Sequence, residues 1–236
     1  FITISETSKK DICRFLGVSP DKVKAVHLAP REVFREIKDE GRLQKIRAKY
    51  SLPEKFVLYV GDVNYNKNLF GLAETCKRLN FPLVVVGKQA KSEAVDRKHI
   101  ENRPFVRFLD KFGDDPLVKR VGFVPDEDLA VIYNLATLFC QPSFYEGFGL
   151  GVLEAFASGC PVVASKTQAL VEIGEPACVF FDPKDPKDMV EKIALVLTDE
   201  VLRNQLRETA KIFVKNYSWE KTARETLEVY QEVLKK

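Results

Sequence analysis

The chain is organised around a glycine-rich stretch, Ser143-Phe-Tyr-Glu146-Gly147-Phe148-Gly149-Leu150-Gly151-Val152-Leu153-Glu154, which follows the apolar run 138–140. Glycine can adopt positive φ and lets a ligand approach the backbone, so three glycines in five residues indicate amides that face a ligand. The residues after Gly151 are apolar and helix-forming, so the pattern predicts a strand, a glycine loop and a helix. Amides at a helix N-terminus bind anions well. The stretch therefore predicts a site for an oxyanion or a phosphate.

Two glutamates flank these glycines, eight residues apart. Glu146 is expected to project from the loop into a cleft, and Glu154 to lie in the first helical turn. Two hydroxylated groups on either side of a phosphate would fit that layout. The alternative is that Glu154 only complements the helix dipole and Glu146 is a solvated loop residue. A carboxylate enclosed in the core, or on a different face from its partner, would exclude the site.

The composition limits the classes of function. The net charge of +3 is too small to indicate nucleic acid, and the lysines are spread along predicted helices, so no nucleic-acid partner is expected. Contact with a membrane has no support either, because the apolar runs fall short of a transmembrane helix and no signal peptide opens the chain. We expect a cytoplasmic chain.

Cysteine and histidine are too few and too scattered for a metal site. The only histidines are His27 and His99, so neither a zinc site nor a Ser-His-Asp triad can be assembled. The cysteines form no C-x-x-C pair and are predicted to be reduced thiols, mostly buried. They are Cys13, Cys76, Cys140, Cys160 and Cys178.

Apolar runs and helical patterns alternate along most of the chain. The predicted strands are 55–61, 82–87, 138–140, 161–164 and 178–181, and the predicted helices are 69–79, 126–135, 151–158 and 186–197. Continuous apolar strands spaced by helices are typical of a parallel sheet covered on both faces. The fold class predicted is α/β, a doubly wound parallel sheet.

The two ends of the chain carry further elements. Residues 2–5 and 22–28 are predicted strands, joined by a helix that Ser5 caps and Gly17 ends. A weakly amphipathic helix is predicted around 43–50, and two long helices, 201–216 and 219–236, close the chain. Residues 88–98 are read as a helix, and 103–115 carry no assignable pattern. Because the chain opens in a strand, it looks like a piece of a longer protein.

Ligands of open α/β sheets bind outside the carboxyl ends of the strands. The candidate site residues are therefore in the loops that follow strands, four of which contain glycine. These loops are 61–68, 87–88, 122–124, 142–150 and 165–170. One shared cleft is expected.

At this level of detail the sequence resembles the retaining nucleotide-sugar glycosyltransferases of family 4, which have the two-domain GT-B architecture. The similarity covers nearly the whole chain, and its motifs are highly specific in their order and spacing. They include Ile2-Thr-Ile-Ser-Glu-Thr-Ser-Lys9, Tyr59-Val-Gly-Asp-Val-Asn-Tyr-Asn-Lys67-Asn68, Val121-Gly-Phe-Val-Pro-Asp-Glu-Asp-Leu129, Pro142 to Leu150 with Glu154-Ala155, Ser158-Gly-Cys-Pro-Val-Val-Ala164, Phe181-Asp-Pro183 and Tyr217-Ser-Trp-Glu220.

The resemblance implies a Rossmann-like, donor-binding C-terminal half of such an enzyme. Residues 1–20 would be the tail end of an N-terminal acceptor domain that is missing here, 21–216 the nucleotide-sugar donor domain, and 217–236 a helix that crosses back to the missing domain. The reaction implied is metal-independent transfer of a hexose from a nucleotide-diphosphate sugar, with GDP-mannose favoured and a UDP-sugar such as UDP-glucose second. No cofactor other than this substrate is implied, and the fragment alone should be inactive or weakly active.

The resemblance also assigns roles to individual residues. Glu146 would touch the transferred sugar and Lys67 the phosphates, which makes these two the catalytic candidates, while Glu154 would hold the ribose hydroxyls. Loop amides would meet the diphosphate and sugar, and main-chain groups near Val124 the base. The donor-binding set is Asn66, Lys67, Gly87, Phe123, Val124, Glu146, Gly147, Phe148, Gly149, Leu150 and Glu154.

Two departures and two rival hypotheses accompany this reading. Asp62 stands where the family commonly has a phosphate-binding arginine, and Gly151 where it commonly has proline.

An NAD-dependent oxidoreductase would need an acidic residue about 20 residues beyond the glycines, but the next predicted strand ends Ala164-Ser165-Lys166. A non-catalytic glycosyltransferase-like module stays open as the second rival.

Overall fold

The computed structural model describes residues 1–92 and 95–235, and its centre is a parallel sheet. Within the described chain this sheet has six strands in the order β5-β4-β3-β6-β7-β8, and every neighbouring pair is parallel. The strands are β3 (Val57–Val60), β4 (Leu83–Val86), β5 (Val118–Gly122), β6 (Leu138–Gln141), β7 (Val162–Ser165) and β8 (Cys178–Phe181). The predicted α/β fold with a parallel sheet is confirmed.

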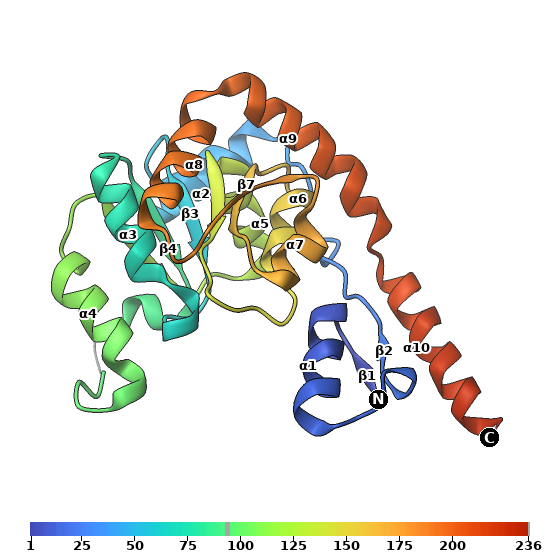
Figure 1. Cartoon of the computed structure of the whole chain (residues 1–236). Coiled ribbons are helices and arrows are strands. Elements are labelled where there is room, and N and C mark those ends of the chain that lie inside the picture. Colours follow the sequence, from blue (N-terminus) through green and yellow to red (C-terminus); the bar gives the residue numbers. More distant parts are fainter. Residues whose placement is uncertain (93–94, 236) are drawn as a thin grey trace.

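Helices cover both faces of the sheet (Figure 1). One face packs against α3 (Leu69–Arg78), α4 (Arg103–Phe112) and α8 (Pro186–Thr198). The other face packs against α2 (Glu40–Tyr50), α5 (Asp126–Leu135), α6 (Leu150–Ala157) and α7 (Gln168–Gly174). The next helix, α9 (Glu200–Phe213), contributes to both hydrophobic cores. Its Leu206 packs on the face that α3, α4 and α8 cover, and its Ala210 packs on the opposite face.

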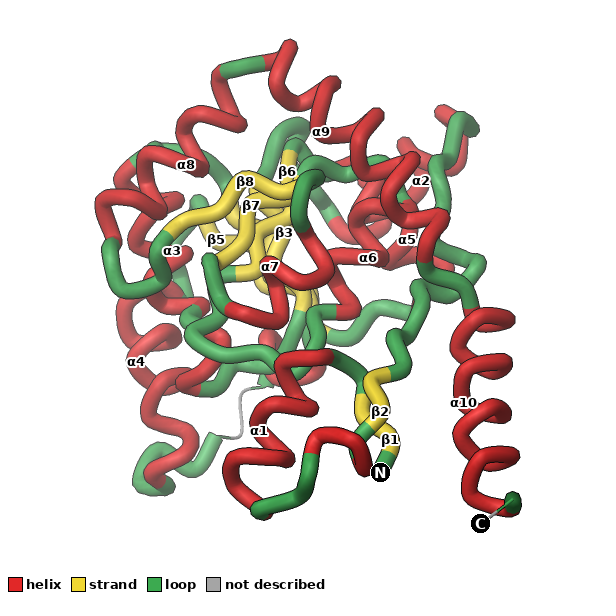
Figure 2. The backbone as a smooth tube through the Cα atoms, turned by 45° about the vertical axis from the view of Figure 1, so that its right-hand side comes forward, coloured by secondary structure: helices red, strands yellow, loops and turns green. Residues whose placement is uncertain are grey.

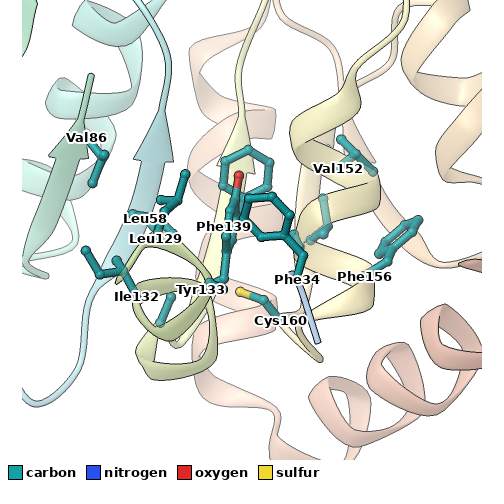
Figure 3. Packing of buried hydrophobic residues seen from close by; sticks show 14 of the residues in the cluster. Phe34, Leu58, Val86, Leu129, Ile132, Tyr133, Phe139, Val152, Phe156 and Cys160 are labelled. Carbon is teal, nitrogen blue, oxygen red and sulfur yellow. The ribbon is translucent and has the colours of Figure 1, made fainter. Parts of the chain in front are cut away.

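Aromatic side chains fill the centre of the second face (Figure 3). Phe139 of β6 is fully buried, and its ring meets the ring of Tyr133 from α5 edge-on, with centroids 5.4 Å apart. Tyr133 also meets Phe34 edge-on at 5.9 Å. Val152 and Phe156 of α6 pack beside them. Such edge-to-face aromatic pairs add to the free energy gained by burial, so they help to fix the position of α5 on the sheet.

The strand order places a topological switch point between β3 and β6. From β3 the chain moves outward to β4 and β5, whereas from β6 it moves the opposite way to β7 and β8. The strands β3 and β6 are neighbours, with Val57 paired with Leu138. The loops that follow them therefore start side by side and lead to opposite halves of the sheet. Ligands of doubly wound sheets bind at such a point.

A small unit of the first 25 residues stands apart from the six-stranded sheet. Here β1 (Ile2–Thr3) pairs in parallel with β2 (Lys24–Ala25), and α1 (Glu6–Leu16) connects them. The Ser5 side chain caps α1, and Gly17 ends it with φ of 64°, as predicted. The small sheet extends beyond the domain boundary predicted at residue 20, because β2 completes it.

The last helix, α10 (Trp219–Leu234), extends away from the sheet toward the end of the molecule where α1 lies (Figures 1 and 2). Ser218 caps it as predicted. The Thr222 hydroxyl ties it to the first part of the chain by donating to the carbonyl of His27 at 2.6 Å. None of its described residues is buried, and the apolar stripe predicted for it is exposed.

One predicted helix is wrong, and three elements were not predicted. The helix predicted over 88–98 is wrong: a short 3-10 turn, Lys88–Lys91, ends at an extended Ser92, and 93–94 lie outside the described residues. Farther on, Asp96 accepts from the Lys98 N–H through its side chain and from Asn102 through its carbonyl, bonds that compete with a helix. The helices α4 and α7 and the strand β5 were not predicted. Pro104 opens α4, and three phenylalanines on one side of it face the core.

All five cysteines are free, and Cys76, Cys140 and Cys160 are buried. Burial raises the pKa of Cys76 and of Cys160 to about 12. None of the described helices is both long enough and apolar enough to cross a membrane.

Candidate functional site

The glycine loop joins β6 to α6 and presents unpaired N–H groups. Gly149 caps α6 with φ of 109°, and a Cβ there would come within 2.6 Å of the Leu170 side chain, so only glycine fits. Within residues 1–92 and 95–235, the N–H groups of residues 147–150 have no hydrogen-bond acceptor. Free donors at the start of a helix are suited to an anion.

Lys67 and Glu146 meet at the switch point. Lys67 ends a 3-10 turn, Tyr65–Lys67, that the Asn64 side chain caps. Its Nζ donates to both carboxylate oxygens of Glu146, at 2.8 Å to Oε1 and 3.0 Å to Oε2. The Lys67 side chain is 26% exposed and that of Glu146 is 11% exposed, so the pair keeps a narrow access to solvent. The two predicted catalytic candidates, from loops 79 residues apart in the chain, lie in direct contact.

Two further side chains hold the Glu146 carboxylate and were not predicted. Gln141 Nε2 and Ser143 Oγ each donate to Glu146 Oε1 at 2.6 Å. Together with Lys67 they give Oε1 three donors, whereas Oε2 has one and can still accept a hydroxyl from a ligand. Gln141 is a buried polar residue at the end of an otherwise apolar strand, and that contrast was a signal available in the sequence.

Glu154 lies deeper than predicted: it is buried, which comes close to the enclosure that would exclude the site, although its side chain is not wholly sealed from solvent. It occupies the second turn of α6 rather than the first, because the helix begins at Leu150. Its side chain is 10% exposed, with Oε1 at 4.0 Å from an Arg31 guanidinium nitrogen and Oε2 at 3.4 Å from the Tyr133 hydroxyl. Burial raises the pKa of Glu154 to about 7, although Arg31 and Tyr133 act to lower it. Arg31 itself is half exposed.

The other predicted residues differ in how they face the site. Asn66 is exposed, and its carbonyl accepts from the Phe144 N–H at 2.7 Å, which ties the two switch-point loops together. A Cβ at Gly87 would stand 2.2 Å from the carbonyl oxygen of Gly61, so this glycine lets the loops after β3 and β4 approach each other. Its structural role is therefore established by sterics, whereas contact with a ligand stays a prediction.

Three hydrophobic members of the predicted set divide into buried and exposed. The side chains of Val124 and Phe148 are each 4% exposed and belong to the core, so only their main chains can face a ligand. Phe123 is 65% exposed, with Lys88 Nζ 5.9 Å from its ring centroid.

A cleft of 680 Å³ opens beside Glu146, between α1 and the sheet. Its walls come from α1, from the loop after β6 and from the segments that follow β7 and β8. Glu146, Tyr145 and Phe144 form one side of it. No group of three His, Cys, Asp or Glu side chains that could hold a metal ion occurs in the described ranges. Fold and loop together define a doubly wound α/β domain with a glycine loop of free amides at its switch point.

Comparisons with known proteins identify the family. Residues 43–213, well over half of the chain, match the glycosyl transferases group 1. The O-antigen chain mannosyltransferase B of Escherichia coli is 28% identical over 237 residues, covering 98% of this chain and 60% of that protein. The chain belongs to the glycosyl transferases group 1.

Solved structures show the same fold. Sucrose-phosphate synthase from Thermosynechococcus elongatus has a TM-score of 0.80 at 24% identity, covering 99% of this chain and 58% of that one. Anabaena HepE in complex with UDP and glucose has a TM-score of 0.81 at 17% identity, covering 98% and 62%. The chain thus spans about three fifths of the length of these proteins. The family leaves the oxidoreductase hypothesis without support.

Proposed function

We propose that this chain is the donor-binding half of a retaining, metal-independent glycosyltransferase. It binds a nucleotide-diphosphate sugar and transfers a hexose, mannose being favoured, to an acceptor held by another part of the protein. The observation that carries the proposal is the set of unpaired N–H groups at residues 147–150, beside the Lys67–Glu146 pair at the switch point.

The chemistry follows from charge. When the bond to the sugar breaks, the leaving nucleoside diphosphate gains negative charge, and fixed amides with one ammonium group stabilise it without reorganisation. Lys67 supplies that ammonium group, and its contact with Glu146 holds it beside the start of the glycine loop. The free acceptor capacity of Glu146 Oε2 suits a sugar hydroxyl. Ionised Glu154 is suited to the ribose hydroxyls, with Arg31 as its countercharge.

The identity of the donor is argued from relatives. Mannose is favoured because the Escherichia coli relative is a mannosyltransferase, so GDP-mannose is the first donor to test. A UDP-sugar such as UDP-glucose is the second, because the structure of Anabaena HepE was solved with UDP and glucose. The base is expected to contact main-chain groups near Val124, whose side chain is buried.

Calorimetric titration of the chain with GDP, UDP, GDP-mannose and UDP-glucose tests the proposal. We expect saturable binding of one diphosphate series, and much weaker binding of the matching nucleoside. The variant Lys67→Met should lose most of the preference for the diphosphate over the nucleoside, because it removes the ammonium group. Absence of binding to all four ligands, or equal affinity for nucleoside and diphosphate, would refute the proposal.

A transfer assay separates the enzyme from the non-catalytic module. The chain spans only part of its relatives, so we propose that the acceptor is bound by an N-terminal domain of a longer protein and that the chain alone turns over poorly. Adding that domain, encoded upstream in the parent reading frame, should raise transfer strongly, and Glu146→Gln should abolish the gain. A full-length protein that binds donor but transfers nothing would favour the non-catalytic reading.

A further inference from the structure

Two hydroxyl groups of the small N-terminal unit converge on one carbonyl of the glycine loop. Ser5 Oγ donates to the Gly147 carbonyl oxygen at 2.6 Å, and Ser8 Oγ donates to the same atom at 3.0 Å. The serines and the glycine are more than 130 residues apart in the chain. A carbonyl oxygen has two lone pairs, and both are used here.

This contact sets the direction of a neighbouring amide. The peptide bond from Gly147 to Phe148 is trans and planar, so its N–H points opposite to its carbonyl. With the carbonyl held against α1, the Phe148 N–H points away from α1, and within the described chain it has no acceptor. Holding the carbonyl therefore orients a free donor of the loop.

The support behind the serines is itself fixed. The Glu172 carboxylate of α7 accepts from the N–H groups of Glu6 and Thr7 at 2.8 and 3.1 Å, and from the Thr7 hydroxyl at 3.0 Å. It also contacts His27 Nε2 at 2.8 Å. A carboxylate at the N-terminus of a helix satisfies donors that the helix leaves unpaired. In this way α1 is attached to the helix that also packs against Gly149.

We propose that Ser5 and Ser8 are positioning residues for the donor loop. They hold the Gly147 carbonyl so that the Phe148 amide stays aimed at the diphosphate and sugar. This inference rests on the proposed function, because it assigns the serines to the same nucleotide-sugar site. It also means that the small unit contributes to donor binding although it lies outside the six-stranded sheet.

Ser8 gives the cleaner test of the two. Ser5 also caps α1, since its Oγ accepts from the Ser8 N–H at 2.8 Å, so Ser5→Ala would weaken the helix as well. Ser8 lies inside α1, and its hydroxyl serves only the loop among the bonds of the described chain. Ser8→Thr keeps the hydroxyl and serves as the conservative variant. Thr226→Ala, which removes a hydroxyl bonded to a carbonyl within α10, is the matched control.

The first measurement is calorimetric affinity for GDP and UDP and for guanosine and uridine. We expect Ser8→Ala to weaken binding of the preferred diphosphate about threefold to tenfold, the size of one hydrogen bond, and to leave the nucleoside unchanged. Ser8→Thr and Thr226→Ala should bind like the wild type. Unchanged diphosphate affinity in Ser8→Ala, or an equal loss for diphosphate and nucleoside, would overturn the inference.

The second measurement needs no ligand. In nitrogen-15 NMR spectra of the free protein, Ser8→Ala should shift the Phe148 amide signal, while amides distant from both Ser8 and the loop keep theirs. An unchanged Phe148 signal would refute the positioning role. If the wild type binds no nucleotide but the Phe148 signal does shift, the proposed function fails while the serines still orient the loop.

Discussion

Replacing Glu154 by glutamine should make the protein more stable and worse at binding nucleotide. Burial raises the pKa of this carboxyl from its ordinary value of 4.5 to about 7, so ionising it is harder in the folded chain than in the unfolded one. The cost of the charge is therefore absent below pH 4.5, grows as the pH rises from 4.5 to 7, and is constant above that range. Glutamine carries no charge and escapes this cost.

The size of the effect follows from the shift. One pKa unit corresponds to about 1.4 kcal/mol, so Glu154→Gln should gain about 3 kcal/mol of unfolding free energy at about pH 8. In a protein of this size each kcal/mol moves Tm by about 2–4 °C, which predicts a rise of roughly 6–12 °C. The gain should vanish at about pH 4, where the wild-type carboxyl is neutral in both states.

Thermal or urea unfolding across this pH range is the assay. The control is Glu228→Gln, which removes the same charge from an exposed position on α10. We expect the control to change Tm little at any pH. A Glu154 variant that gains nothing at about pH 8, or gains equally at about pH 4, would refute the reasoning from burial.

The same carboxyl should make nucleotide binding depend on pH. If ribose hydroxyls bind the ionised form, only about one tenth of the free protein is competent at about pH 6, against about nine tenths at about pH 8. Affinity should therefore rise about tenfold between these values, and Glu154→Gln should bind weakly and without this pH dependence. An affinity independent of pH in the wild type would count against the ribose role.

The remaining predictions concern the loop and the ion pair. Gly149→Ala forces a side chain into φ of 109° and should cost about 1–3 kcal/mol of stability, whereas Gly147→Ala, whose Cβ would stand in ordinary contact 3.6 Å from Ser8 Oγ, should fold normally and lose only nucleotide affinity; parallel Tm and binding measurements distinguish them. Lys67→Met should lower affinity for the diphosphate at least tenfold. The control Lys77→Met breaks the 2.7 Å ion pair with Asp115, away from the cleft, and should leave this affinity unchanged. Equal effects of the two substitutions would contradict the role of Lys67 in binding phosphate.

Much of the fold follows from patterns that are local in sequence. The five strands predicted between residues 55 and 181 recur in the structure because each is a short apolar run bounded by glycine or proline. Caps such as Ser5, Gly17 and Ser218 could be predicted because they act on their own turn. The helix α7 could not, since its seven residues are too few for a clear period.

The sequence named candidate residues for the site but could not give their contacts. The spacing of Glu146 and Glu154 around the glycines indicated an anion site, and Lys67 came from the resemblance. The ion pair between Lys67 and Glu146, however, depends on two loops brought together by the strand order. The burial of Glu154 depends likewise on packing against Tyr133 and on the distant Arg31. Contacts of this kind have no local signal.

Mapping a bound nucleoside diphosphate onto the chain tests the donor site most directly. Nitrogen-15 NMR spectra recorded during titration with GDP or UDP should show the largest shifts at the amides of residues 147–150 and at Lys67, and these should saturate together. Saturable binding whose shifts fall elsewhere, with residues 147–150 unaffected, would contradict the assignment of this loop as the diphosphate site.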